Sequence, residues 1–395
     1  NENITNSLSP WSRIVGVPGN LAVSIIIQDP DNTNIMYLGT GESYTAGDAY
    51  GNGIYKSTDG GNNWSLIYGR GGTGTVTSTN SGFGETFVNG FFYVNDLVLW
   101  DHDKNPGTQK LLFAAIGSSY VRGDKMKSTY TDLNEFGLYK SSDSGASFSR
   151  ITDLNNGGGT TRDLYNVNDL EIQAVSNRLW LSTTNNWWGG GAPGGRFWFS
   201  DDGTNFTQAS PNYPATPTIN QGQIYRTEIA PSAIDTDTHY VLMRANAGSG
   251  NKPFIFKTTD NYTNFTYVVG PNDVDTGIDA DDFTRGQAWY DLEIEIDPTS
   301  NDKVYVGGIN WHKTSNGGDS WEQISKWHPT AFDYNTINCS VIHADQHGLY
   351  FRPGNPNQAI VVNDGGVAYV SSLSDADTND RFTENERGMI TTQFY

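Results

Sequence analysis

A short motif that recurs along the chain constrains the fold more than any other sequence feature. Its first copy, Ser57–Trp64, combines hydroxyl residues, an Asp, two Gly and a closing Trp. Two close copies end at Phe148 and Trp321, and two weaker copies end at Phe206 and Phe265. Glycine accepts the positive φ of a tight turn, Asp accepts hydrogen bonds from turn amides, and an aromatic ring can pack on a core. The motif therefore predicts a β-hairpin that is repeated through the chain.

The spacing of the closing aromatic residues indicates the size of the repeating unit. Successive rings lie 84, 58, 59, 56 and 61 residues apart by subtraction, at Trp64, Phe148, Phe206, Phe265, Trp321 and Phe382. A propeller blade of four strands occupies roughly 40–45 residues in compact repeats, so each interval fits one blade with its loops. The spacing predicts five clear units and a sixth that ends near Phe382.

The motif resembles the Asp-box, or BNR repeat, of sialidases, sortilin-type receptors and oligoxyloglucan hydrolases. The resemblance implies an all-β fold, a β-propeller of six to seven four-stranded blades with an Asp-box hairpin closing each blade. Residues 1–18 are expected to be a lead-in segment, and residues 19–395 a single propeller domain. That domain is either closed by its own strands or part of a longer secreted chain with further domains.

Composition supports strands and limits the partners. The 395 residues include 45 Gly, and only 17% are charged. No apolar run approaches the roughly 18 residues of a membrane helix, so membrane insertion is not expected. The formal net charge of −20 argues against nucleic acid, because phosphate groups would be repelled. Few Lys, much Asn, Thr and Gly, and a single Cys are typical of secreted bacterial proteins, which predicts a secreted or cell-surface location.

An Asp recurs at one point of the expected first strands. Asp96 and Asp169 follow Val-Asn, Asp291 follows Trp-Tyr, and Asp345 follows His-Ala. The first strand of a blade lines the central channel, so these four residues are predicted to form an arc around its mouth. Their role is either a ligand or cation site or a repeated structural contact with the neighbouring blade. If they converge, their repulsion is expected to raise pKa values or recruit a cation, and to favour a neutral polysaccharide.

Two segments contain residues that bind divalent cations. In His343-Ala344-Asp345-Gln346-His347, a strand of period two would place both imidazoles and the carboxylate on one face. The alternative is a hydrogen-bonded network in the channel. The loop from Asn272 to Asp282 contains Asp273, Asp275 and Asp279, whose oxygens suit calcium, although it lacks the EF-hand pattern. Its alternative is a solvated acidic loop.

Aromatic residues in long loops are further ligand candidates. Trp187 and Trp188 lie in a long Gly-rich loop on the expected mouth face, and Glu42 begins another such loop. Trp311 is a third Trp whose ring is a candidate for contact with a ligand. Indole rings stack on sugars and anchor protein partners, but one Trp of the pair could equally belong to the core.

Two classes of function remain open. The first is a binding or adhesion module that grips a glycan or a cell-surface protein. The alternative is a glycoside hydrolase, polysaccharide-degrading or sialidase-like, that uses two carboxylates at the mouth. A fold does not specify its function, so whether the protein is an enzyme stays undecided, and the binding module is favoured.

Overall fold

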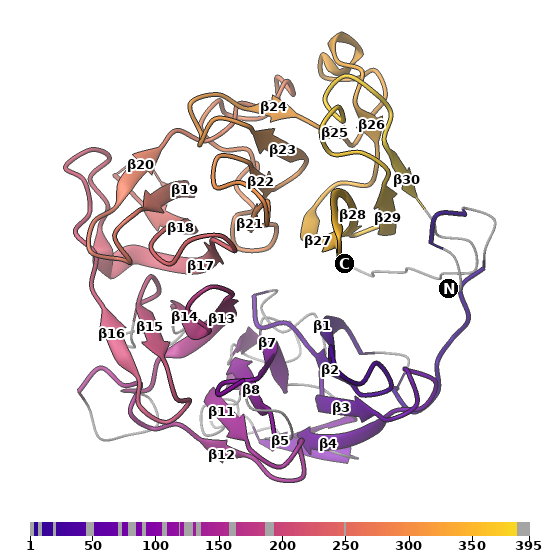
Figure 1. Cartoon of the computed structure of the whole chain (residues 1–395), viewed down its shortest axis with the longest axis vertical. Helices are drawn as coiled ribbons and strands as arrows, with labels where there is room; N and C mark the ends of the chain where they lie inside the picture. The colour runs from indigo at the N-terminus through magenta and orange to yellow at the C-terminus, as the bar shows by residue number, and fades with distance from the viewer. Residues whose placement is uncertain are drawn as a thin grey trace.

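The strands group into six four-stranded antiparallel sheets, arranged as the blades of a β-propeller around a central channel (Figure 1). This computed structural model describes residues 4–6, 10–18, 21–44, 51–69, 73–77, 84–88, 92–104, 109–117, 119–121, 129–131, 136–157, 163–185, 193–248 and 250–384. In every blade the first strand borders the channel and the fourth lies at the rim. The predicted fold class is confirmed, with six blades in the described part of the chain.

The strand bounds follow the order expected from the sequence. Blades one to three consist of β1 Val23–Gln28, β2 Met36–Thr40, β3 Gly53–Ser57 and β4 Ser65–Gly69; β7 Tyr93–Trp100, β8 Leu111–Gly117, β11 Gly137–Ser141 and β12 Ser149–Arg150; and β13 Asn166–Gln173, β14 Arg178–Thr184, β15 Phe197–Ser200 and β16 Thr207–Ala209.

Blades four to six consist of β17 Ile224–Pro231, β18 His239–Asn246, β19 Asn251–Thr258 and β20 Thr266–Val268; β21 Glu293–Ile296, β22 Val304–Gly307, β23 Trp311–Thr314 and β24 Glu322–Gln323; and β27 Gln346–Arg352, β28 Asn355–Asn363, β29 Gly366–Val370 and β30 Phe382–Glu384. The 3-10 turns that the described residues contain in full are η2 Gln221–Gln223 and η3 Tyr334–Thr336. No helix there is long and apolar enough to cross a membrane.

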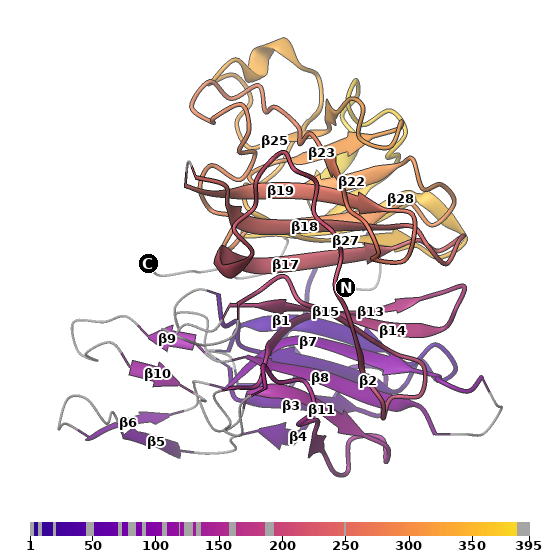
Figure 2. The same ribbon diagram turned by 90° about the vertical axis from the view of Figure 1, so that its left-hand side faces the viewer.

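Three short ribbons stand outside the blades. They are β5 Thr73–Thr77 with β6 Gly84–Val88, β9 Ser119–Val121 with β10 Thr129–Thr131, and β25 Ser325–Lys326 with β26 Ser340–Val341. The first two ribbons belong to long connections of blades one and two, and both project from the same side of the disc in Figure 2. These two long connections therefore lie on one face of the propeller.

The repeated motif forms the turn between the third and fourth strands of blades one to five. In blade one the Ser57 hydroxyl accepts from the Gly61 amide at 2.9 Å, and Asp59 Oδ1 accepts from the Asn63 amide at 2.9 Å. In blade three the turn is one residue shorter, and Asp202 accepts from Asn205, three positions later. The local geometry agrees with the hairpin predicted from the motif.

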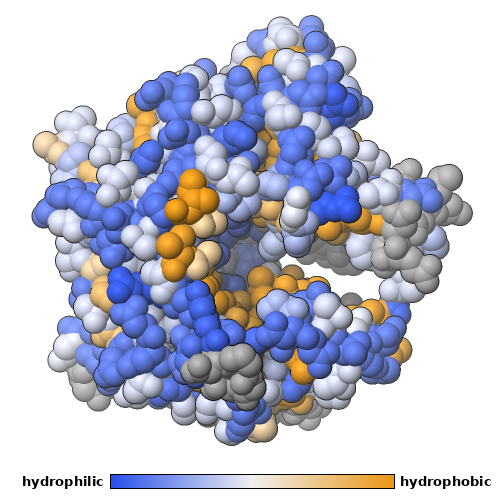
Figure 3. All heavy atoms as spheres, viewed as in Figure 1, coloured by the Kyte–Doolittle hydropathy of each residue, from blue (hydrophilic) through white to orange (hydrophobic). Residues whose placement is uncertain are grey.

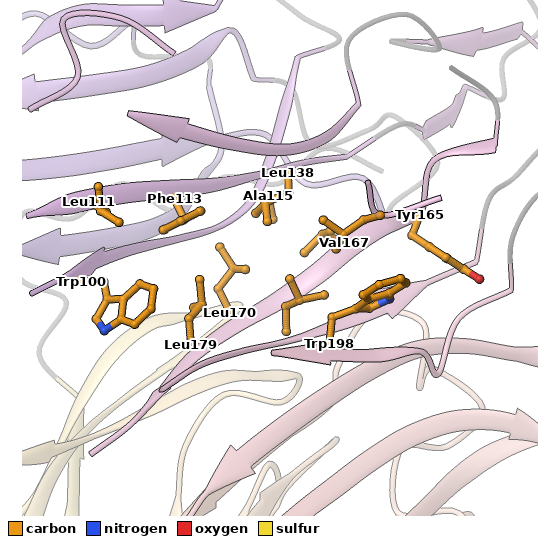
Figure 4. Close-up of a cluster of buried hydrophobic side chains, with 12 residues drawn as sticks. Trp100, Leu111, Phe113, Ala115, Leu138, Tyr165, Val167, Leu170, Leu179 and Trp198 are labelled. Carbon is orange, nitrogen blue, oxygen red and sulfur yellow. The ribbon is translucent and has the colours of Figure 1, made fainter. Parts of the chain in front are cut away.

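Each pair of consecutive blades encloses a layer of apolar side chains. Between blades two and three, Figure 4 shows Trp100 and Phe113 facing Leu170 and Leu179 across one continuous layer. Similar buried clusters join blades one to two, three to four, four to five and five to six. The molecule is therefore held together mainly by contacts between neighbouring blades.

Blades six and one form an exception. None of the buried clusters in the described residues joins these two blades, and the space-filling view is hollowed at the channel and open between them (Figure 3). On either side of this seam, Ile26 is 50% exposed and Tyr350 is 48% exposed. The lead-in segment packs against blade one instead, where Val17 and Leu21 contact the cluster around Trp64.

Candidate ligand site at the channel mouth

The inner strands of blades two and three are distorted at the Asn-Asp pair that the sequence singled out. The register of β7 with β8 shifts between Val94 and Asp96, and that of β13 with β14 shifts between Val167 and Leu170. A β-bulge of this kind turns side chains away from the regular alternation. The Asn and Asp side chains consequently reach the backbone of the next blade.

These pairs hold neighbouring blades together. Asn95 Nδ2 donates to the Val167 carbonyl at 2.9 Å, while Asp96 Oδ2 accepts from the Leu170 amide at 2.7 Å. One blade further on, Asn168 Nδ2 donates to the Thr227 carbonyl at 2.7 Å and Asp169 Oδ2 accepts from the Ile229 amide at 2.7 Å. For Asp96 and Asp169, the geometry favours the structural alternative over a ligand role.

Asp291 and Asp345 do not repeat this arrangement. Asp291 lies in a bend before β21, because its amide and that of Tyr290 both bond to the Gln287 carbonyl. Neither Asp291 oxygen has a hydrogen-bond partner in the described part of the chain, although the residue is fully buried. Asp345 precedes β27 and has a φ of 62°. The sequence predicted equivalent positions for four Asp residues. Only Asp96 and Asp169 have equivalent contacts in the structure.

Burial raises the pKa of all four carboxyl groups. The pKa of Asp96 rises to about 8, and those of Asp169 and Asp291 rise well above the usual value. The raised pKa of Asp345 has burial as its main cause, followed by the charge of Asp364. Repulsion among the carboxylates contributes, as expected from the sequence, but loss of hydration is the larger effect.

The three residues of the His343-x-Asp345-x-His347 motif have different contacts. Asp345 is outside the strand, so the period-two reasoning that placed all three on one face is wrong. The His347 ring bonds to Asp364 Oδ1 at 2.8 Å, whereas the exposed His343 donates its amide to Glu384 Oε1 at 2.7 Å. Within the described residues, no group of three or more His, Cys, Asp or Glu side chains is arranged to hold a metal ion. A bound metal here stays a prediction.

The acidic loop contains both buried and exposed Asp residues, and Asp273 and Asp275 are buried. Asp273 accepts from Asn310 at 2.7 Å and from Tyr334 at 3.2 Å, and Asp275 accepts from the Gly277 amide at 2.7 Å. Asp279 is exposed. The oxygens that calcium would use on Asp273 and Asp275 thus already accept protein donors, and the solvated-loop alternative is wrong for these two residues. Calcium binding itself stays untested.

The aromatic candidates have different outcomes. Trp311 is fully buried in the cluster between blades five and six, so the prediction that its ring contacts a ligand is corrected. Trp311 lies in the short strand β23, and its side chain packs into this buried cluster. Trp187 and Trp188 lie outside the described residues.

Glu42 does lie at the mouth, on a turn that carries it towards other blades. The preceding Gly41 has a φ of 83°, and a Cβ there would come within 2.7 Å of the Phe92 carbonyl oxygen. Burial raises the pKa of Glu42, while the charges of His347 and Arg226 lower it and the Asp364 charge raises it. Residues of blades one, four and six therefore share one electrostatic environment.

Arg226 is the central cation of this environment. It donates to Glu228 at 2.7 Å, reaches Glu293 at 3.4 Å, and bonds to the Tyr290 carbonyl. Its guanidinium also lies 4.4 Å from the Tyr44 ring centroid. Deeper in the channel, burial raises the pKa of Glu295 to about 8 and that of Glu171 well above its usual value. Arg226 is consequently neutralised by surrounding carboxylates.

A small open pocket adjoins Arg226, with an interior of about 10 Å³ that holds roughly one water molecule. It is lined by three aromatic rings, two guanidinium groups and two uncharged polar side chains, namely Tyr44, Tyr225, Trp289, Arg226, Arg244, Thr184 and Asn185. The Arg244 guanidinium lies 4.8 Å from the Tyr225 ring centroid. Flat apolar rings beside hydrogen-bonding groups are suited to a sugar or another amphipathic ligand.

Four of the seven lining residues were not singled out from the sequence, namely Tyr44, Thr184, Asn185 and Trp289. They belong to no repeated motif, so the regularities of the chain do not mark them. One signal was available: Arg226 is the second residue after Ile224 in the bulge of β17, as Asp96 and Asp169 are after Val94 and Val167, and it too bonds to the backbone of the following blade. An Arg in place of a repeated Asp marks a break in the structural pattern.

Comparison with known proteins identifies β-propellers. A GH74 enzyme of Niastella koreensis is 16% identical over 92% of this chain and 49% of its own, with a TM-score of 0.46. A GH74 xyloglucanase of Xanthomonas campestris is 13% identical over 93% of this chain and 52% of its own, with a TM-score of 0.46. An α-L-arabinofuranosidase of Fusarium graminearum is 12% identical over 92% of this chain and 97% of its own, with a TM-score of 0.47. The likeness is one of fold.

The chain spans about half the length of the two GH74 proteins. No protein-family model matches the sequence, and no curated protein matches it either. The family of this propeller therefore stays open, including the Asp-box assignment.

Proposed function

We propose that the protein is a secreted or cell-surface carbohydrate-binding propeller whose ligand lies in the pocket at the channel mouth. The observation that carries the proposal is the lining of that pocket, in which the rings of Tyr44, Tyr225 and Trp289 occur together with guanidinium, hydroxyl and amide groups. Aromatic rings supply apolar area for the faces of a sugar, and guanidinium, hydroxyl and amide groups supply bonds to its hydroxyls. A cell-surface protein is the other partner considered from sequence.

The test is Trp289→Ala on a glycan array and by calorimetry with the best array ligand. Loss of the indole ring is expected to weaken binding by about 10- to 100-fold, the usual effect of a ring that forms the centre of a site. Phe332→Ala removes an exposed ring outside the pocket lining and serves as the matched control. Absence of any array ligand, or equal affinity of Trp289→Ala and the native protein, would contradict the proposal.

Glycoside hydrolysis is a second candidate, favoured by the state of Glu42. Its raised pKa suits a proton donor to a leaving oxygen, and Asp364, which accepts from His347 and Tyr290, suits the ionised partner. The structural neighbours include a xyloglucanase and an arabinofuranosidase, whose activities apply to those proteins. Release of reducing sugar by the native protein and its loss in Glu42→Gln would support hydrolysis. Binding without turnover would leave the protein a binding module.

A further inference from the structure

We infer that the pocket reads a carboxylate group through Arg244, so that the glycan it binds contains a hexuronate residue. This inference rests on the proposed carbohydrate-binding function and specifies its ligand. It replaces the expectation from sequence that an acidic mouth would favour a neutral polysaccharide.

The two guanidinium groups of the pocket differ in what they contact. Arg226 is matched by the carboxylates of Glu228 and Glu293 and by a backbone carbonyl. Arg244 has no ion-pair partner in the described part of the chain, and its Nε is buried there without a hydrogen-bond acceptor. Arg244 therefore brings to the same cavity a positive charge that no described carboxylate pairs with, while its Nε is covered by protein and closed to a ligand.

The surroundings of Arg244 explain why no protein group fills this role. Asp282 is the acidic residue whose charge acts on it, but the Asp282 oxygens already accept from Thr284 and from the Gly286 amide. Tyr225 covers the guanidinium with its ring rather than with a carboxylate. A partly buried guanidinium without a carboxylate partner is costly, and charge-assisted bonds from a ligand to its terminal nitrogens offset that cost.

The shape and charge of the site favour carboxylate over other anions. A guanidinium stacked on a ring offers a planar fork that matches a planar carboxylate with two parallel bonds. A phosphate group carries more charge than one guanidinium balances, in a protein whose net charge is −20. On a sugar, a carboxylate beside ring faces and hydroxyls is the chemistry of a hexuronate.

The experiment compares trigalacturonate with its carboxyl-reduced, neutral counterpart by calorimetry. The native protein is expected to prefer the uronate by about 10- to 100-fold, the range of a charge-assisted hydrogen-bonded pair. Arg244→Gln should abolish this preference, because it weakens binding of the uronate more than binding of the neutral sugar. Arg244→Lys, which keeps the charge and loses the fork, should retain part of the preference. Thermal melting of each variant confirms that it is folded.

The outcomes separate this inference from the function it rests on. Equal binding of both sugars by the native protein, or an undiminished uronate preference in Arg244→Gln, would overturn the inference and leave carbohydrate binding intact. A stronger preference for a sulfated trisaccharide would also overturn it. Failure to bind any sugar, in the native protein and in Trp289→Ala alike, would contradict the proposed function itself.

Discussion

Asn168 and Asp169 illustrate how much depends on single side chains at the inner strands. The Asn168 amide bonds to the Thr227 carbonyl at 2.7 Å and to Glu228 Oε1 at 2.9 Å, so it joins two blades and also orients the carboxylate that holds Arg226. A residue with a structural role thus positions the mouth as well. The sequence analysis treated a structural contact and a ligand site as alternatives, but Asn168 contributes to both.

Replacing Asn168 by Ala is expected to destabilise the fold by about 1–3 kcal/mol, because the buried Thr227 carbonyl loses its donor. Chemical denaturation gives this quantity directly. Asn272→Ala, at an exposed Asn, is the control and should change stability by less than about 0.5 kcal/mol. Equal stability of the two variants would mean that the bond between the blades contributes little.

At the scale of elements, the repeated turn is a unit that the sequence predicts well. A Ser or Thr hydroxyl and an Asp side chain accept turn amides in the same order in blades one, two and four. Blade five uses Asn316, whose Oδ1 accepts from the Ser320 amide at 3.0 Å. An acceptor oxygen at this position, rather than a negative charge, is therefore what the turn requires.

This view predicts different results for two substitutions at Asp143. Asp143→Asn should keep most of the melting temperature, since Oδ1 still accepts from the Ser147 amide, whereas Asp143→Ala should lower it by a few degrees. Differential scanning calorimetry makes the comparison. Neither variant should change glycan affinity, because the turn lies at the rim. If Asn proved as harmful as Ala, the charge would be essential.

The element scale also shows where sequence reasoning stops. Turn chemistry and strand order are local, so the spacing of the closing rings was enough to predict blades and a sixth unit ending at Phe382, which begins β30. Which side chains meet at the mouth depends on bulges and on contacts between blades. The observed strand β27 begins one residue after Asp345, and that difference alone removes the predicted face of two His and one Asp.

At the scale of the whole molecule, the junctions between neighbouring blades differ in how much apolar surface they bury. Ile116 is fully buried in the cluster between blades one and two, while Ile26, on the seam side of blade one, is half exposed. The two residues are a matched pair in the same region of the ring. They measure what a closed junction contributes relative to an open one.

Ile116→Ala should cost about 2–5 kcal/mol, because it leaves a cavity in a packed layer. Ile26→Ala should cost less than about 1 kcal/mol, since little area returns to water. Urea denaturation of both variants makes the comparison. A large cost at Ile26 would indicate that the seam is packed in solution.

Buried carboxyl groups in the channel predict an unusual dependence of stability on pH. The folded-state pKa of Asp96 and of Glu295 is about 8, so between pH ~4 and ~8 the folded protein binds protons that the unfolded chain releases. This contribution is complete at low pH and is lost as pH rises through that window. Hydrogen bonds in the turns lower the pKa of Asp143 and Asp202 to about 2, and their contribution is lost as pH falls towards that value.

The melting temperature should therefore be highest near pH 4 and decline towards pH 8. A series of melts in buffers from pH 2 to 9 tests this, and Glu295→Gln should flatten the decline on the alkaline side. A melting temperature that climbs steadily from pH 4 to 8 would be the opposite result.

The junction between blades six and one matters for the mouth. Glu42 belongs to blade one, and His347 and Asp364 belong to blade six, so these charged groups act on one another across the one pair of neighbouring blades that no buried cluster of the described residues joins. The distance between the carboxyl groups of Glu42 and Asp364 therefore depends on how the two blades pack at this junction, and a change in that packing alters the mouth directly.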